Sequence, residues 1–227
     1  MKRNLVIFGI GKIAEVVYYY ANEECGYNVV AFCVDAEFKN ADTFQGVPLV
    51  SFEKVDEIYP ANANDIFIAV GYHDLNALRE KKCDEARNKG YNLVSIISPL
   101  ANVPKNVSVG WNCFIMPPAI IHPCVVIKNN VFIWSGTMVG HHSIIEDNCW
   151  LTSSCNIGGN VTLGANTFMA VNATIGHSVS VGKNCFIGAN ALATKNVLDE
   201  QVLIVESTKP IRLTSKQFLK ISSFSTL

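Results

Sequence analysis

The sequence has no excess of one charge and no long apolar run. Its 227 residues include 18 Lys and Arg and 19 Asp and Glu, a net charge of −1, without a basic run or an acidic tail. Nucleic acids and anionic membranes attract clustered positive charge, so we expect neither as a partner. No apolar run approaches the ~18 residues of a membrane span. The first apolar segment covers only residues 5–10, too short for a signal peptide, and we expect a cytoplasmic protein.

Cysteine pairs at metal-binding spacing are also missing. The chain has eight cysteines, and no two of them are separated by two residues, the spacing that is typical of zinc and redox sites. Disulfides are not expected in a cytoplasmic chain. We therefore interpret all eight as structural thiols and predict no metal site.

Proline is absent between Pro123 and Pro210. Most of the six-residue repeat, the strongest pattern in the sequence, lies in this stretch. Every sixth residue from Val103 to Ala193 is apolar. Four residues after each of these comes a small residue, which forms a second row: Val107, Cys113, Ala119, Val125, Val131, Thr137, Ser143, Cys149, Cys155, Val161, Thr167, Ala173, Val179, Cys185 and Ala191. A period of six indicates a β-solenoid of hexapeptide repeats, because neither a helix nor a two-layer sheet repeats at this interval.

Three six-residue faces make a coil of about 18 residues, so residues 103–193 predict about five coils at the ~4.8 Å spacing of neighbouring strands. Four cysteines fall in the small row and are expected to point into the core, which excludes them as nucleophiles: Cys113, Cys149, Cys155 and Cys185.

The first part of the chain has the pattern of an open α/β domain. A strand at residues 4–8 runs into the glycine turn Gly9-Ile10-Gly11-Lys12-Ile13-Ala14. A helix at residues 13–24, a second strand at residues 29–34 and the acid Asp35 follow. In dinucleotide and nucleotide-sugar sites this layout brings backbone N–H groups at a helix N-terminus close to a phosphate. The alternative is a tight strand–helix turn with a solvent-facing Asp35.

Two further strands, at residues 65–70 and 91–97 with a helix at 76–89 between them, predict a small parallel sheet. Ligands of such sheets bind at the carboxyl ends of the strands. The candidate substrate-binding residues at this edge are Gly9, Gly11, Lys12, Asp35, Gly71 and His73. No complete second mononucleotide-binding half fits before residue 97, so a nucleotide diphosphate fits better than a whole NAD.

Three segments follow from these patterns. Residues 1–98 are predicted to form a nucleotide-sugar-binding α/β domain, and residues 99–200 the solenoid. Residues 201–227 are predicted to be a carboxyl-terminal cap or tail, with a strand at 202–205 and a short helix at 215–221.

Three histidines fall on corners of the predicted prism. His141 and His177 are two coils apart on one edge, with Gly159 between them, so we expect ~10 Å between the two histidines. This distance is too long for a shared zinc ion. Exposed histidine is a good general base, because its ordinary pKa is near neutrality. His141 and its neighbour His142 are therefore the catalytic candidates, and solvated surface histidines are the alternative.

The glycine-turn domain joined to hexapeptide repeats resembles the NeuD/PglD-like sugar acyltransferases over nearly the whole chain. The resemblance implies a Rossmann-like half followed by a left-handed parallel β-helix, a homotrimer, and acetyl-CoA as co-substrate in the groove between neighbouring β-helices. Carried over by position, it implies that His141 is the general base. It also implies that Gly9 and Gly11 form the phosphate turn and that Asp35 contacts the nucleotide.

The sequence also departs from that family. His142 stands where some members have glutamate, and Trp150 stands where some have a second histidine near the CoA thioester. Trp134 replaces an asparagine one repeat before the base. The predicted CoA-binding residues are Trp150 and, along the histidine edge, Gly159 and His177.

The predicted function is an acetyl-CoA-dependent N-acetyltransferase that acts on a nucleotide-linked amino deoxysugar, a glycan precursor. The acetyl group is transferred directly, with no acyl-enzyme. One alternative is O-acetylation of a sugar hydroxyl, as in sialic-acid-modifying relatives. Another is a non-catalytic hexapeptide scaffold.

Overall fold

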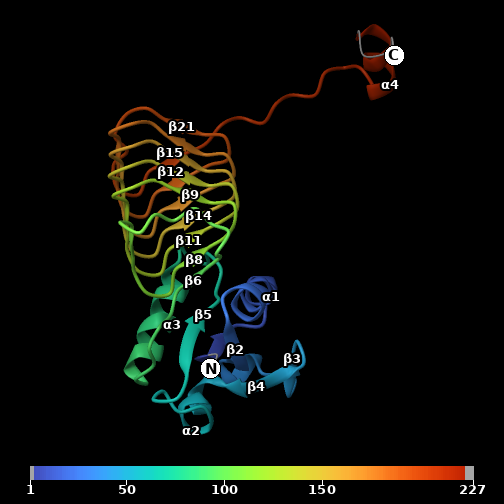
Figure 1. Cartoon of the computed structure of the whole chain (residues 1–227). Coiled ribbons are helices and arrows are strands. Elements are labelled where there is room, and N and C mark those ends of the chain that lie inside the picture. Colours follow the sequence, from blue (N-terminus) through green and yellow to red (C-terminus); the bar gives the residue numbers. More distant parts are fainter. Residues whose placement is uncertain (1–2, 223–227) are drawn as a thin grey trace.

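A computed structural model of the chain describes residues 3–222. A prism of short strands adjoins a smaller α/β unit, and a thin carboxyl-terminal arm leaves the far end of the prism (Figure 1). The α/β unit comes first in the chain, and the prism follows it.

The amino-terminal unit is built on one five-stranded sheet with the strand order β3-β4-β2-β1-β5. All its pairs are parallel except β3–β4. The strands are β1 (Arg3–Phe8), β2 (Tyr27–Val34), β3 (Thr43–Phe44), β4 (Val47–Ser51) and β5 (Asp65–Ile68). The helices are α1 (Lys12–Tyr19), which continues as a π-helical turn (Tyr20–Glu24), α2 (Val55–Ile58) and α3 (Ala77–Asn88), with short 3₁₀ turns at Ala36–Phe38 and Phe52–Lys54.

The sheet differs from the prediction in two ways. It gains β3 and β4, which the sequence analysis did not predict, because Val47–Ser51 pairs with β2 and buries Leu49. The strand expected at 91–97 does not form in this sheet. Leu93 makes only an isolated bridge to Ile66. Ile96–Ile97 instead forms β6, which pairs with the solenoid, so the chain leaves the sheet before this segment ends.

The solenoid has three parallel sheets, in which each strand pairs with the strand one coil away, as Phe132 does with Trp150. We call the first sheet the aromatic face: β6 (Ile96–Ile97), β8 (Phe114–Ile115), β11 (Phe132–Ile133), β14 (Trp150–Leu151), β17 (Phe168–Met169), β20 (Phe186–Ile187) and β22 (Val202–Leu203). The second contains β7 (Ser108–Val109), β10 (Val126–Ile127), β13 (Ile144–Ile145), β16 (Thr162–Leu163) and β19 (Ser180–Val181). The third contains β9 (Ile120–Ile121), β12 (Met138–Val139), β15 (Asn156–Ile157), β18 (Thr174–Ile175) and β21 (Leu192–Ala193).

Both six-residue rows pack in the solenoid core, as predicted. The hydroxyl and thiol members of the small row also donate hydrogen bonds to backbone carbonyls in the next coil. Ser143 Oγ donates to Gly158 O at 2.9 Å, and Cys149 Sγ donates to Gly164 O at 3.2 Å. A small side chain that carries one donor therefore satisfies the position, which explains why cysteine, serine and threonine share the row.

Burial makes the row cysteines poor nucleophiles. It raises the pKa of Cys113 and Cys155 to about 11 and that of Cys149 to about 12. Because the thiolate is the reactive form, these side chains remain protonated and inert near neutral pH. The interpretation of the row cysteines as packing residues is consistent with these positions.

A thiol-labelling experiment can check this packing. Only Cys124 is exposed among the cysteines, and half-buried Cys25 has its pKa raised to about 11, chiefly by burial. We expect one fast thiol in native protein treated with a disulfide reagent, and eight after denaturation. Cys124→Ser should remove the fast phase. A second fast thiol in the native protein would contradict the packing of the rows.

Most solenoid corners contain a residue in the left-handed backbone region. These residues recur every six positions and are mostly asparagine, which tolerates positive φ better than most residues: Asn112, Cys124, Asn130, His142, Asn148, Ser154, Asn160, Asn166, Asn172, Ser178, Asn184 and Asn190. The row is visible in the sequence as asparagine recurring at six-residue intervals. It places His142 (φ 59°) at a position that serine and asparagine also occupy.

The aromatic face packs against the amino-terminal unit. Its outward residues recur every 18 positions: Phe114, Phe132, Trp150, Phe168 and Phe186. Phe132 and Trp150 stack with ring centroids 4.8 Å apart, and Phe67 of β5 lies 5.7 Å from Phe132. These contacts join the two parts into one apolar cluster.

Arg79 of α3 is fully buried at this contact. Its guanidinium lies over the rings of Phe132 and Trp150, at 4.5 and 5.1 Å. It donates to Asn130 Oδ1 at 2.9 Å and to the backbone carbonyls of Asn130 and Asn148, both at 3.1 Å. Burial lowers its pKa to about 10. Arg79 thus ties α3 to two coils of the solenoid through neutral acceptors.

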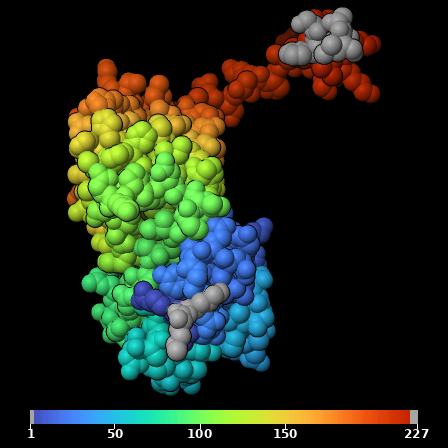
Figure 2. All heavy atoms as spheres, viewed as in Figure 1, coloured from blue at the N-terminus to red at the C-terminus, as the bar shows by residue number. Residues whose placement is uncertain are grey.

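The carboxyl-terminal arm caps the solenoid less than expected. β22 pairs with β20, but residues 204–221 are all exposed and project away from the body (Figures 1 and 2). The arm ends in α4 (Ser215–Ile221), the helix predicted there, which begins with a capping box between Thr214 and Gln217. The last predicted residues, 223–227, lie outside the described part of the chain.

Candidate active site

His141 and His142 follow β12, and His177 follows β18, so all three lie along one edge of the prism, which we call the histidine corner. All three side chains are exposed. The ring centroids of His141 and His177 are 6.2 Å apart, closer than the ~10 Å expected for two coils. The expected value describes the spacing of the backbones, whereas the rings approach each other across the intervening coil.

Gly159 provides the space for this approach. A Cβ atom at Gly159 would lie 2.8 Å from both Cε1 and Nε2 of His141. The His141 ring therefore occupies the volume that a side chain would fill at this position. The sequence placed Gly159 between the two histidines, and the structure adds that its missing side chain positions the imidazole.

Substitution of Gly159 tests this contact. The backbone of Gly159 is not in the left-handed region, so Gly159→Ala brings no φ penalty and acts through the added methyl group. We expect the displaced ring to lower kcat by about 10- to 100-fold. Steady-state kinetics should be combined with the unfolding midpoint. An unchanged kcat in a folded variant would show that the position of the ring over Gly159 does not matter.

His142 is the polar neighbour of His141. The two Nδ1 atoms are 3.1 Å apart, and the rings meet edge to face. Glu146, the nearest acid in the sequence, forms no ion pair with His141. Within residues 3–222, no ion pair joins any histidine to a carboxylate. The structure thus places an imidazole, rather than an acid, beside the candidate base.

A separate cavity of about 670 Å³ lies at the carboxyl ends of β1 and β5. Five of the six predicted substrate-binding residues line it: Gly9, Gly11, Lys12, Gly71 and His73. Gly9 has φ +120°, and a Cβ there would lie 2.8 Å from the carbonyl oxygen of Ala69, so the turn requires glycine. Gly11 is the N-cap of α1 and faces open space, which leaves the helix N-terminus accessible to an anion.

Asp35 does not line this cavity. Its carboxylate pairs with Lys82 Nζ at 2.6 Å, and the same ammonium group also contacts Glu85 at 2.7 Å. The predicted nucleotide contact thus already has a protein partner. The sequence pattern places Asp35 correctly at the end of β2, but Lys82 lies too far along the chain for this pairing to be foreseen.

Trp150 also requires a correction. Its side chain is only 2% exposed, and it packs against both Phe132 and Arg79 rather than in a groove. Tyr72, which lines the cavity, contacts it at 5.5 Å. In this structure Trp150 is therefore inaccessible to CoA, because it forms part of the contact between the two domains. Trp134 lies beside it, with ring centroids 5.7 Å apart.

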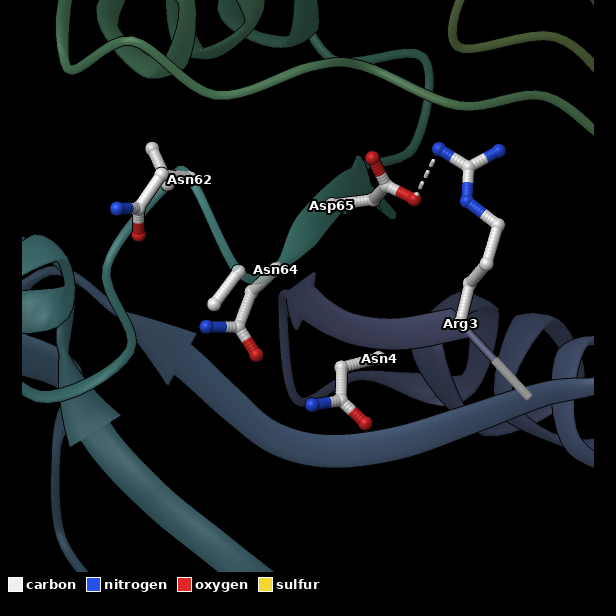
Figure 3. A pocket seen from close by; sticks show the side chains of 7 residues that line it. Arg3, Asn4, Asn62, Asn64 and Asp65 are labelled. Carbon is white, nitrogen blue, oxygen red and sulfur yellow. Dashed lines mark ion pairs between the residues drawn. The ribbon is translucent and has the colours of Figure 1, made fainter. Parts of the chain in front are cut away.

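A second pocket, of about 380 Å³, lies at the opposite edge of the amino-terminal sheet. It is lined by polar residues at the amino ends of β1 and β5, among them Asn4, Asn62 and Asn64, and the ion pair between Arg3 and Asp65 lies at its side (Figure 3). Because parallel sheets bind ligands at the carboxyl ends of their strands, we do not assign the substrate to this pocket.

The described part of the chain contains neither a metal centre nor a membrane-spanning helix. Residues 3–222 hold no group of three or more His, Cys, Asp or Glu side chains placed to share a metal ion. No helix in the same part of the chain has the length and apolar character to cross a membrane.

The whole fold has counterparts among solved structures. Perosamine N-acetyltransferase from Caulobacter crescentus, solved with CoA and GDP-perosamine, is 26% identical with a TM-score of 0.80, over 90% of this chain and 97% of that chain. A histidine-to-asparagine variant of that enzyme matches equally well. The acetyltransferase domain of PglB from Neisseria gonorrhoeae, solved with acetyl coenzyme A, is 21% identical with a TM-score of 0.80, over 89% and 96%. Protein-family models and curated proteins give no match to the sequence.

These comparisons confirm the resemblance to the NeuD/PglD-like sugar acyltransferases. The similarity extends over the amino-terminal unit and the solenoid together. The match to PglB rests on lower identity and supports the fold alone.

Proposed function

We propose that the chain is an acetyl-CoA-dependent N-acetyltransferase that acts on a nucleotide-linked amino deoxysugar. The observation that carries this proposal is the match, over nearly both full lengths, to an N-acetyltransferase holding CoA and a GDP-linked amino sugar. This chain has an exposed histidine pair on the solenoid and a glycine-lined cavity on the sheet, the two parts that the proposed reaction uses.

In the proposed reaction His141 acts as general base. The sugar amine attacks the thioester carbonyl of acetyl-CoA and gives its proton to His141 Nε2. The new C–N bond forms first and gives a tetrahedral oxyanion, and collapse of this intermediate breaks the C–S bond. The CoA thiolate leaves and takes up the proton held by His141. Backbone N–H groups of the solenoid turn stabilise the developing oxyanion. No acyl-enzyme forms, which agrees with the burial of the row cysteines.

The cavity on the amino-terminal sheet is the proposed nucleotide site, in a Rossmann-like half. The phosphates of the nucleotide are proposed to approach the N-terminus of α1, where Gly11 faces open space and Lys12 is exposed. A helix N-terminus and a lysine both attract anions. Gly71 and His73 form the other wall. Acetyl-CoA is proposed to lie along the histidine corner, over Gly159 and beside His177.

The two sites of one chain lie on different sides of the solenoid. His141 lies in the turn between β12 and β13, which belong to the two sheets other than the aromatic face. In a three-sided prism this corner is opposite the aromatic face, which packs on the amino-terminal unit. We therefore infer that a sugar held by one chain reaches His141 of another copy. This arrangement supports an oligomer, for which the resemblance implies a homotrimer of left-handed β-helices. A cytoplasmic location is the prediction from the sequence.

Mixed oligomers test this arrangement. His141→Asn lacks the base, and Lys12→Glu repels the phosphates but leaves the corner intact. We expect each variant alone to be nearly inactive. Mixed oligomers should recover activity, because the intact cavity of a His141→Asn chain meets the intact His141 of a Lys12→Glu chain. Activity should be followed after refolding the two variants together. The absence of recovery in verified mixed oligomers would place both sites in one chain.

The function itself is tested by thiol release. Purified protein, as the Cys124→Ser variant to lower background labelling, is mixed with acetyl-CoA and a panel of nucleotide-linked amino sugars and their hydroxyl analogues. We expect release of CoA thiol with an amino sugar and an acetylated product by mass spectrometry. Release only with hydroxyl sugars would indicate O-acetylation, and no release with any sugar would favour the scaffold.

A further inference from the structure

The contact between the two neighbouring histidines carries an inference about protonation. His141 Nδ1 and His142 Nδ1 are 3.1 Å apart. A hydrogen bond between two imidazole nitrogens requires one to carry a proton and the other a lone pair. The pair therefore has two neutral arrangements, which differ in which ring donates.

Only one arrangement leaves His141 able to act as a base at Nε2. If His141 donates from Nδ1, its Nε2 has a free lone pair, and this atom lies over Gly159. If His142 donates instead, His141 carries its proton on Nε2 and cannot accept another there. A neighbouring hydrogen bond decides which ring nitrogen is protonated.

We propose that His142 is the positioning residue of the site, accepting a hydrogen bond at Nδ1 and holding His141 in the Nδ1–H form. The proposal rests on the proposed function of His141. It assigns to a neutral imidazole the orienting task that a carboxylate performs in many His-based sites. No carboxylate within residues 3–222 is paired with either ring to perform it.

The backbone at His142 does not by itself call for an imidazole. His142 has φ 59°, and the same left-handed corner position is occupied by Ser154, Ser178 and many asparagines with similar φ. Serine and asparagine thus satisfy the fold at this position. The distinguishing property of His142 is an acceptor nitrogen that reaches its neighbour.

The same row provides matched variants. His142→Ser introduces serine, which the solenoid already has at the equivalent corner positions Ser154 and Ser178. Its hydroxyl is too short to accept the hydrogen bond that Nδ1 of His142 accepts. In His142→Asn the Oδ1 atom takes the place of Nδ1 along the side chain, and the fold also uses asparagine here. We expect His142→Ser to lower kcat by about 10- to 100-fold with little change in either KM. His142→Asn should recover most of the loss.

Histidine ¹⁵N NMR gives a readout independent of turnover. The chain has five histidines, and the His141 signal is assigned by its loss in His141→Asn. We expect Nδ1–H in the native protein and a shift toward Nε2–H in His142→Ser, with unchanged unfolding midpoints. An Nε2–H form of His141 in the native protein, or full kcat in His142→Ser, would overturn the proposal. Failure of the native protein to release thiol would count against the proposed function, and the NMR result would still decide the pairing.

Discussion

His141→Asn is expected to lower kcat by about 10²- to 10⁴-fold, the usual contribution of a general base. An amide cannot accept the proton of the attacking amine, so the loss belongs to the chemical step. KM for the sugar and for acetyl-CoA should change little, because the cavity and the rest of the histidine corner are untouched. Steady-state thiol release with the active sugar measures both parameters.

His177→Asn is the matched control, because it makes the same substitution on the same corner, with its ring centroid 6.2 Å from that of His141. As a proposed CoA contact, His177 should affect KM for acetyl-CoA more than kcat. Both variants should unfold at the same denaturant concentration as the native protein, since both side chains are exposed. A near-native kcat for folded His141→Asn would reject His141 as the base.

Trp150→Ala is expected to destabilise the protein by about 3–5 kcal/mol, the usual cost of removing a buried large aromatic side chain. Trp150 stacks on Phe132 and contacts Arg79 and Tyr72. Its removal would leave a cavity between the two domains. It would also remove one of the aromatic rings that contact the buried Arg79 guanidinium. Denaturant unfolding measures the change in the free energy of unfolding.

Trp150→Phe separates packing from ligand binding. It keeps an aromatic ring on Phe132 and should retain most of the stability, and KM for acetyl-CoA should stay unchanged because the side chain is buried. A large rise in this KM at an unchanged unfolding midpoint would restore the assignment of Trp150 to CoA binding and contradict its position between the domains.

The solenoid and the histidine corner could be predicted because the relevant signals are periodic or local. Each six-residue step meets the same core environment, so the same demand for an apolar and a small residue returns at every repeat. The spacing from His141 to His177 then places both on one edge without coordinates. The glycine turn is equally local, because Gly9 and Gly11 sit between one strand and the helix that follows it.

Other features of the site depend on residues far apart in the chain. Lys82 reaches Asp35 across 47 residues, and Arg79 reaches Asn148 across 69. No spacing rule links such pairs. The aromatic row from Phe114 to Phe186 was visible at 18-residue intervals, but its period alone does not tell a ligand groove from a domain contact.

The amino-acid sequence alone determined that this protein is a coil of hexapeptide repeats behind a glycine-turn domain, with paired histidines on one corner. Repetition makes those features readable, because every coil repeats the same packing requirement. Only the tertiary structure decided which of the three faces the amino-terminal domain covers. That choice buries Trp150, places Arg79 against the solenoid and puts His141 on the opposite corner, because burial of a face depends on the partner surface that comes to lie against it.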